Sequence, residues 1–321
     1  MKKMNRCALA ALALIGTSAA FAQSSVTLYG RVNTTFEHQK EGNVSKTGLF
    51  NNSSRFGFKG TEDMGGGLKA GFQLEAGFDS SSGATSSTFF GRQSEVNLSG
   101  GFGMVRLGNF TSESYYATAD FISNHNHDTG SSSDALYAYP ARDANKIAYR
   151  TPSFGGATLE AGVALHEQAN GTGGKNSLDL AANYEIGALG LGAGYSKLGD
   201  QNQFAVRASY STGPFVMGAY VQRDKNVFFA NGGNRTNVRL SGAYILGPSE
   251  FHLNVGRAGK YSNVADSAAT QYTVGYNYNL SKRTKVYTFY TRVNNNRNAS
   301  YAVGTAGNDF SSFAVGVRHN F

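Results

Sequence analysis

Residues 68–78 read LKAGFQLEAGF, and apolar side chains occupy every second position of this stretch. Lys69, Gln73 and Glu75 fall on the intervening positions, together with glycines. Because successive side chains of a β-strand point to opposite faces, this spacing predicts a strand with one apolar face and one polar face. Met64-Gly65-Gly66 precedes the stretch and predicts a tight turn into it.

The same alternation recurs along the chain from Ser25 to Phe321, in segments of about ten residues. We predict sixteen strands, near 24–36, 50–62, 67–79, 89–99, 103–109, 145–152, 157–167, 176–187, 190–198, 202–211, 215–223, 235–246, 250–259, 269–280, 284–294 and 309–321. Short glycine-rich links follow every even-numbered strand, as at Gly187-Ala188 and Thr212-Gly213-Pro214. Longer polar loops join the other ends, at 37–49, 224–234, 260–268 and 295–308.

This double alternation is typical of a barrel that crosses the bacterial outer membrane, with short turns on the periplasmic side and long loops outside. The composition agrees, since 41 glycines stand against 4 prolines, and proline would remove ladder hydrogen bonds. A soluble propeller or solenoid is disfavoured because no fixed repeat period is present. The sequence therefore predicts an all-β fold, a 16-stranded antiparallel transmembrane β-barrel with both termini in the periplasm.

The N-terminus has the features of a secretory signal. Lys2, Lys3 and Arg6 precede an apolar run over 8–15, and Ala20-Phe21-Ala22 forms a cleavage motif. We therefore expect residues 1–22 to be a cleaved signal peptide and residues 23–321 to be the barrel domain. The only cysteine, Cys7, leaves with the signal, which suits export through an oxidising compartment.

The charge balance is mildly basic. Cleavage removes three of the 29 lysines and arginines and leaves 26 against 21 acidic residues. The basic residues are spread over the strands rather than clustered, and no zinc spacing or RNA-binding motif is present. We therefore predict no nucleic-acid partner.

Four motifs and the C-terminal residue carry a family resemblance. They are SVTLYG at 25–30, SRFGFKGTEDMGGGLKA at 54–70, FGMVRLG at 102–108, YRTPSFGG at 149–156, and Phe321. Together they resemble the general porins of β-proteobacteria and neisseriae, over the whole mature chain. The resemblance implies a homotrimer in outer-membrane lipid, passive diffusion of small hydrophilic solutes and ions, a preference for anions, and no cofactor. It also implies that Phe321 is the signal read by the barrel assembly machinery.

The resemblance further implies that the third external loop, residues 110–144, folds into the barrel and narrows the pore. A connection of that length without its own secondary structure is usually functional. The acidic residues expected at the constriction are Glu75 on the wall and Glu113, Asp120, Asp128 and Asp134 on the loop. The resemblance places a cluster of arginines opposite the loop, at Arg55, Arg92 and Arg142. Strand parity supports Arg55, does not support Arg92, and adds Arg31, Arg106 and Arg150 to the inward face.

Three alternatives remain open at the level of sequence. The first is an outer-membrane enzyme, but the six histidines lie in no nucleophile motif, and we predict no catalytic residues. His125 and His127 with Asp128 are weak evidence for a metal site, and none is predicted. The second is a plugged barrel with an adhesive or structural role. The third is a substrate-specific channel. The run Gly190-Leu191-Gly192-Ala193-Gly194 lacks the strand–helix context of a nucleotide site and is interpreted as strand glycines.

Overall fold

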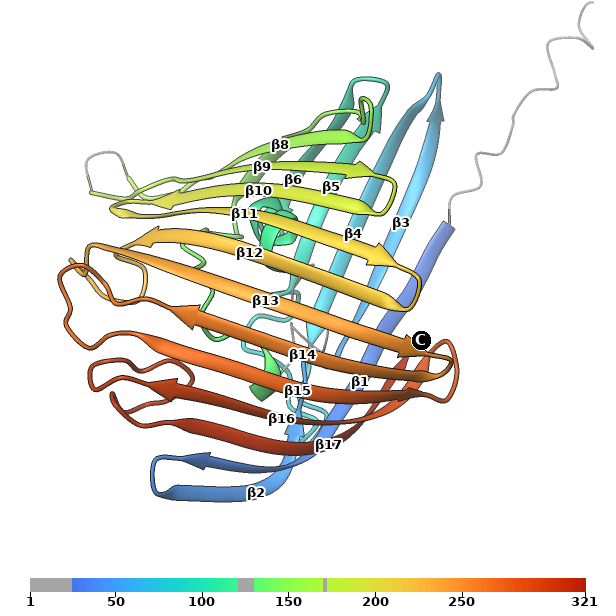
Figure 1. Ribbon diagram of the computed structural model, residues 1–321. Coiled ribbons are helices and arrows are strands. Elements are labelled where there is room, and N and C mark those ends of the chain that lie inside the picture. Colours follow the sequence, from blue (N-terminus) through green and yellow to red (C-terminus); the bar gives the residue numbers. More distant parts are fainter. Residues whose placement is uncertain (1–24, 121–129, 170–171) are drawn as a thin grey trace, which may run out of the picture.

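The computed structural model describes residues 25–120, 130–169 and 172–321. Seventeen strands form one sheet in which every hydrogen-bonded pair is antiparallel, and the sheet closes because β1 pairs with β17 (Figure 1). The strands are β1 Ser25–Glu41, β2 Val44–Asn51, β3 Arg55–Gly65, β4 Leu68–Gly77, β5 Gln93–Gly100, β6 Gly103–Asn109, β7 Lys146–Arg150, β8 Ala157–Ala164, β9 Ser177–Ile186, β10 Leu189–Leu198, β11 Gln201–Thr212, β12 Phe215–Lys225, β13 Asn234–Leu246, β14 Ser249–Ala258, β15 Ala269–Asn279, β16 Thr284–Asn295 and β17 Phe310–Asn320.

Around the barrel these seventeen strands fill sixteen positions, as predicted. β2 pairs with the second half of β1 and β3 pairs with its first half, so β2 and β3 are two parts of one interrupted strand. The interruption includes Ser53, whose φ is 56°. Asn52 and Ser54 on either side are buried, and both hydrogen-bond to Asn33 of β1. The break therefore leaves the ring of strands closed.

The structure corrects the prediction of a loop over 37–49. β1 continues to Glu41, turns at Gly42 with a φ of 55°, and returns as β2. The outward positions of this extension include His38 and Lys40, which are polar. Because the extension has no apolar face, the alternation that identifies the other strands is missing from it.

The two faces of the barrel differ as the alternation predicts. Outward apolar side chains such as Phe72, Leu180 and Val315 are exposed on the isolated chain, whereas inward polar side chains are buried. Near the short turns, an aromatic band of Phe215, Tyr244, Phe251 and Tyr276 has ring centroids 5.1–6.4 Å apart. Aromatic rings are enriched at this level of a membrane.

The ends of the described chain lie together at the end of the barrel that carries the short turns (Figure 1). Phe321 exchanges two backbone hydrogen bonds of 3.0 Å with Gly30, and its ring lies against the space that a Cβ of Gly30 would fill. Phe321 thus takes part in closing the barrel. Among the described residues, no helix has the length and apolar character needed to cross a membrane.

Candidate functional site: the inward loop and the basic wall of the lumen

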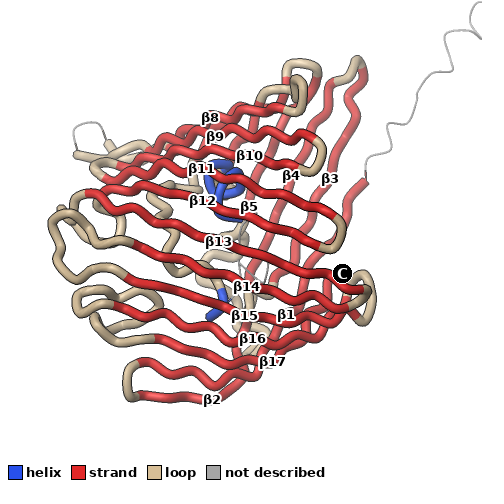
Figure 2. Tube along the Cα trace, viewed as in Figure 1, coloured by secondary structure: helices blue, strands red, loops and turns tan. Residues whose placement is uncertain are grey.

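The connection between β6 and β7 enters the barrel, as predicted for the third loop. Its short helical segments are α2 Glu113–Tyr115, the π-helical η1 Tyr116–Asp120 and the 3₁₀ segment η2 Gly130–Ser132. Figure 2 shows them inside the ring of strands. Ala117, Thr118 and Leu136 of the loop are fully buried, so the loop is packed into the lumen rather than suspended in it.

The first anchor of the loop is on β9 and β10. The Ser114 hydroxyl donates to Asp179 at 2.6 Å, and the Ser196 hydroxyl donates to the same carboxylate at 2.9 Å. On β10, a Cβ at Gly194 would come within 2.6 Å of the Ser114 carbonyl oxygen, and a Cβ at Gly192 would overlap the carbonyl of Ala117. The glycines of this run therefore allow the loop backbone to lie directly on the strand.

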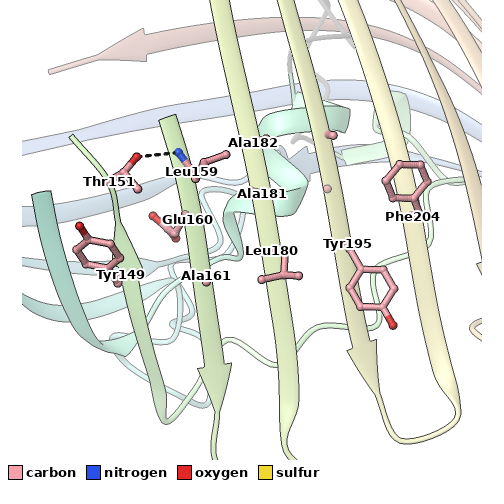
Figure 3. A pocket seen from close by; sticks show the side chains of 12 residues that line it. Tyr149, Thr151, Leu159, Glu160, Ala161, Leu180, Ala181, Ala182, Tyr195 and Phe204 are labelled. Carbon is pink, nitrogen blue, oxygen red and sulfur yellow. Dashed lines mark hydrogen bonds between the residues drawn. The ribbon is translucent and has the colours of Figure 1, made fainter. Parts of the chain in front are cut away.

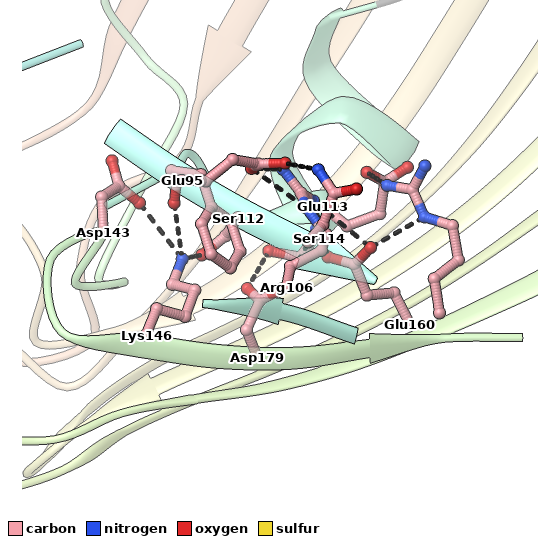
Figure 4. Close-up of polar contacts among 12 residues, drawn as sticks. Glu95, Arg106, Ser112, Glu113, Ser114, Asp143, Lys146, Glu160 and Asp179 are labelled. Carbon is pink, nitrogen blue, oxygen red and sulfur yellow. Dashed lines mark hydrogen bonds and ion pairs between the residues drawn. The ribbon is translucent and has the colours of Figure 1, made fainter. Parts of the chain in front are cut away.

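The second anchor is a chain of ion pairs between loop and wall (Figure 4). Arg150 pairs with Glu113 of the loop and, at 2.7 Å, with Glu160 of β8. Arg106 pairs with Glu160 at 3.2 Å and with Glu95 at 2.6 Å. Burial raises the pKa of the Glu113 carboxyl, and the charge of Arg150 opposes that rise. Three carboxylates thus share two arginines, so Arg106 and Arg150 do not supply uncompensated positive charge.

The third anchor holds the second half of the loop against β12–β15. Asp134 pairs with Arg239 at 2.5 Å and accepts a hydrogen bond from Tyr220. Arg235 donates to the carbonyl oxygen of Leu136 at 2.8 Å. Gln222 donates to the Ala138 carbonyl and accepts from the Ala138 amide. The loop is therefore bonded to the wall along most of its described length.

Across the lumen from the first anchor lies a wall of basic residues. β10 stands eight positions from β1 whichever way the sixteen-position ring is counted, so the two strands are diametrically opposed. On β1, inward Arg31 is directly opposite Arg55 of β3. Arg55 lies 3.5 Å from Glu75 of β4, and Arg92 lies 2.6 Å from the same carboxylate.

Arg92 reaches this wall because it does not belong to a strand. The sequence predicts a strand over 89–99, in which Arg92 would share outward parity with Val96, but β5 begins at Gln93. Phe89 instead packs against Phe56, with ring centroids 6.2 Å apart. The alternation of inward and outward side chains along β5 therefore does not apply to Arg92, and its guanidinium reaches the Glu75 carboxylate.

The wall continues onto β17 and β16 through two residues that the sequence analysis did not single out. Arg318 is opposite Asn33 of β1 and also opposite Lys285 of β16. Lys285 has the same parity on β16 as the buried, inward Tyr287. Arg318 is opposite Lys285, so it also lies on the inward face. We define Lys285, Arg318, Arg31, Arg55 and Arg92 as the basic wall. Parity within β16 and β17 could have identified the first two.

The inward loop approaches this wall through η1. Tyr116 is one of its more exposed residues, and burial nevertheless raises the pKa of its hydroxyl. The negative charges of Asp120, at the end of η1, and of Glu75 raise this pKa further. The positive charge of Arg92 lowers it. Tyr116 thus faces the Arg92 side of the basic wall, whereas Asp120 also lies near Arg207 of β11.

The remaining predicted residues lie elsewhere. Arg142 donates to the carbonyl oxygen of Leu165 at 3.1 Å, just beyond the end of β8. Arg142 is therefore bound to a part of the barrel that does not belong to the basic wall. Asp128, His125 and His127 lie outside the described residues. Within the described residues, no cluster of three or more His, Cys, Asp or Glu side chains is arranged to hold a metal.

The cations that hold the loop were not predicted from the sequence. Arg207 donates to the Ala117 carbonyl at 2.8 Å, and Arg235 and Arg239 make the contacts described above. All three occupy inward positions of β11 and β13. Strand parity places such residues in the lumen, but only the path of the loop shows what they bind.

Comparison with known proteins agrees with this geometry. The family model described as Gram-negative porin matches residues 8–298. Outer membrane porin protein 32 of Delftia acidovorans is 34% identical, over 99% of this chain and 100% of its own length. Major outer membrane protein P.IB of Neisseria meningitidis serogroup A is 29% identical, over 94% of this chain and 95% of its own length.

Among solved structures, the anion-selective porin from Comamonas acidovorans superposes with a TM-score of 0.80 at 29% identity, covering 93% of this chain and 100% of that one. The closed barrel, the loop packed inside it and the family match lead to one assignment. The chain belongs to the Gram-negative porin family and is an outer-membrane channel for passive diffusion.

Proposed function

We propose that this porin prefers anions and that the basic wall sets the preference. The observation that carries the proposal is the excess of cations on this side of the lumen. Arg55 and Arg92 share one carboxylate, Glu75. Arg31, Arg318 and Lys285 occupy inward positions of neighbouring strands, and Glu37 of β1 and Glu250 of β14 are further carboxylates near them. The carboxylates of the loop at Glu113 and Asp134 are paired with Arg150 and Arg239. The anion selectivity named for the Comamonas acidovorans porin, a structural relative, supports the same sign.

The mechanism is electrostatic. Cations held on one side of a narrow passage create a positive potential that raises the local concentration of anions and lowers that of cations. The low-dielectric protein wall strengthens this potential relative to open water. Solutes move down their own gradients, so the chain acts as a channel without catalysing a reaction.

We assign the constriction to the gap between η1 and the wall. Arg55, Arg92 and Glu75 form its basic side, and Arg31 extends that side along β1. Tyr116 and Asp120 form the opposite side. Arg106, Arg150, Glu113 and Asp134 hold the loop in place, and Arg142 lies nearer the external mouth.

Three further features belong to the proposal. The mature protein consists of residues 23–321 after removal of the signal peptide 1–22. It assembles as a homotrimer in outer-membrane lipid. Phe321 serves as the signal for the barrel assembly machinery, and its exposed ring at the short-turn end supports that role.

The test is the reversal potential of the purified protein in a planar bilayer under a KCl gradient. A potential of the sign given by chloride permeation, with conductance that steps in threes, supports the proposal. A potential of the opposite sign rules out control by the basic wall. Flux that saturates and is blocked by one class of solute would indicate a substrate-specific channel. A folded barrel without conductance would indicate a plugged barrel.

A further inference from the structure

A buried arginine lies where three external loops meet the inward loop. Arg235 occupies an inward position of β13, and its side chain is fully buried. Nε donates to Asp224 of β12 at 2.7 Å, and Nη1 donates to the hydroxyl of Tyr301 at 2.8 Å. Nη2 donates to the carbonyl oxygen of Leu136 at 2.8 Å. The guanidinium thus joins the barrel wall, the external loop over 296–309 and the inward loop.

Three aromatic rings lie against the same guanidinium, one from each of three external loops. The ring centroid of Phe228, in the loop 226–233, is 4.7 Å from the guanidinium carbon. The centroids of Tyr261, in the loop 259–268, and of Tyr301 are each 5.3 Å from it. The Tyr261 hydroxyl also donates to Asp224, the ion-pair partner of Arg235. Because a cation is attracted to the face of an aromatic ring, the three loops converge on Arg235.

The three external loops are also bonded to one another, at the same end of the barrel (Figure 1). The side chain of Asn263 donates to the carbonyl of Asn231 at 3.0 Å, which joins the loops 259–268 and 226–233. The side chain of Asn298 donates to the carbonyl of Ala265 at 2.8 Å, which joins the loops 296–309 and 259–268. The three loops therefore form one connected layer.

On its other side, Arg235 is connected to η1 by a short route. Leu136, whose carbonyl oxygen Arg235 binds, is followed directly by Tyr137. The hydroxyl of Tyr137 is 2.7 Å from the hydroxyl of Thr118, which belongs to η1. The ring of Tyr137 packs edge-on against Tyr115 of α2, with ring centroids 5.6 Å apart. The position of η1 is therefore linked to the position of Leu136.

Burial makes the contacts of Arg235 depend on one another. The side chain has no exposed surface, so water cannot replace a partner that moves away. A buried donor left without a partner costs the full desolvation of that group. Movement of either Tyr301 or Leu136 alone would leave such a donor. We therefore expect the guanidinium and its partners to move together.

We propose that Arg235 is a positioning residue of the pore, which fixes the place of η1 and ties it to the external loops 226–233, 259–268 and 296–309. Displacement of these loops then loosens the constriction from outside. The proposal rests on the constriction assigned above, but not on a preference for anions. Since Asp224 neutralises Arg235, the arginine acts through position rather than through charge.

The test measures how easily a reagent reaches η1. Asp120, at the end of η1, is replaced by cysteine in a Cys7→Ser background, so that the folded protein contains one thiol. The probe is a small neutral methanethiosulfonate, and mass spectrometry of the intact protein gives its reaction rate. A neutral probe reports the position of η1 whichever ion the pore prefers. The result is therefore independent of the test of ion selectivity.

Two variants release the guanidinium in different ways. Phe228→Leu removes one ring from its face, and Arg235→Lys keeps the charge but loses the planar fork. Each is expected to raise the reaction rate about threefold, within the range of coupling carried by packed side chains. The double variant should react no faster than Arg235→Lys alone, because both changes act through one group. Gel mobility without heating reports folding, and Tyr301→Phe replaces Arg235→Lys if the latter does not fold.

Two controls make the same change of side chain elsewhere. Phe229→Leu alters the next residue of the same external loop, whose ring packs against Tyr261, with centroids 5.4 Å apart. Phe204→Leu alters a residue that lines an apolar recess of about 470 Å³ on the outward face of β7–β11 (Figure 3). Both controls should leave the reaction rate unchanged.

The proposal is overturned if either control raises the rate as much as Phe228→Leu, because the effect would then be a general loosening of the barrel. It is also overturned if Phe228→Leu and Arg235→Lys both react at the rate of the parent protein. In that case the contacts on β9 and β10 hold η1 without Arg235. Strictly additive effects in the double variant would overturn it as well, since the two residues would then act separately.

Discussion

Asp134 of the inward loop and Arg239 of β13 form a buried ion pair, with 2.5 Å between the carboxylate and the guanidinium. The same guanidinium donates to Gln271 at 2.7 Å. Gln271 in turn donates to the carbonyl of Ser133, the residue before Asp134, at 2.7 Å. An acid that sequence reasoning assigned to the constriction is thus part of the structure that holds the loop to the wall.

We therefore expect Asp134→Asn to loosen the second half of the loop. The variant leaves Arg239 buried without its counter-charge, and breaking a buried pair in this way typically costs about 3–5 kcal/mol. The thermal unfolding temperature should fall, and single-channel current should become noisier. Asp200→Asn, at an exposed turn, should change neither property.

The pair can also be tested by a double variant. Asp134→Asn combined with Arg239→Met removes the isolated buried charge and should recover part of the lost stability, because residues in contact do not act additively. If the stability losses of the two single variants simply add in the double variant, the ion pair does not hold the loop.

Removal of a cation and removal of a carboxylate from the basic wall should change the ion selectivity in opposite directions. Arg92→Gln should lower the ratio of chloride to potassium permeability about twofold, since one cation of the wall is lost. Glu75→Gln should raise the ratio, because it removes the carboxylate that Arg55 and Arg92 share. The measurement is the reversal potential in a KCl gradient. Lys225→Gln, on the outward face, serves as the control and should leave the ratio unchanged.

The same mechanism predicts a dependence on ionic strength. The screening length falls from about 10 Å at 0.1 M salt to about 3 Å at 1 M salt. At a fixed concentration ratio across the bilayer, chloride preference should therefore be greater at the lower salt. A preference that is constant over this range would point to pore size rather than to charge as its origin.

The glycines of β10 should control the width of the lumen. Gly192→Val places side-chain atoms where the Ala117 carbonyl now lies, so η1 must move away from β10 toward the basic wall. Overpacking of this kind usually costs about 1–3 kcal/mol, and single-channel conductance should fall. Gly242→Ala is the control, because a Cβ there meets only the carbonyl of Val216 at 4.0 Å.

Much of the barrel could be predicted from the sequence because apolar and polar side chains alternate within each single strand. The alternation in 68–78 requires one face to be apolar, and β4 shows it with no information from its neighbours. The extension of β1 beyond Phe36 was missed for the same reason, since its outward side chains are polar. Arg55 was correctly placed in the lumen by parity alone.

The partners of the charged residues could not be predicted in this way. Arg106 and Arg55 have the same inward parity, yet Arg106 is neutralised by Glu95 and Glu160. That difference depends on the register between neighbouring strands and on the path of the loop. Arg92 depends on where β5 begins, which its alternating sequence does not define.

The bonds of the inward loop also imply an order of folding. Asp134 lies 105 residues before Arg239, and Ser133 lies 138 residues before Gln271. The second half of the inward loop is thus made early in the chain but is held by strands made late. Contacts between residues so far apart form slowly, because a long stretch of chain must first be ordered. The second half of the inward loop can therefore reach its final position only after the last strands have joined, so the pore takes its final shape at the end of assembly.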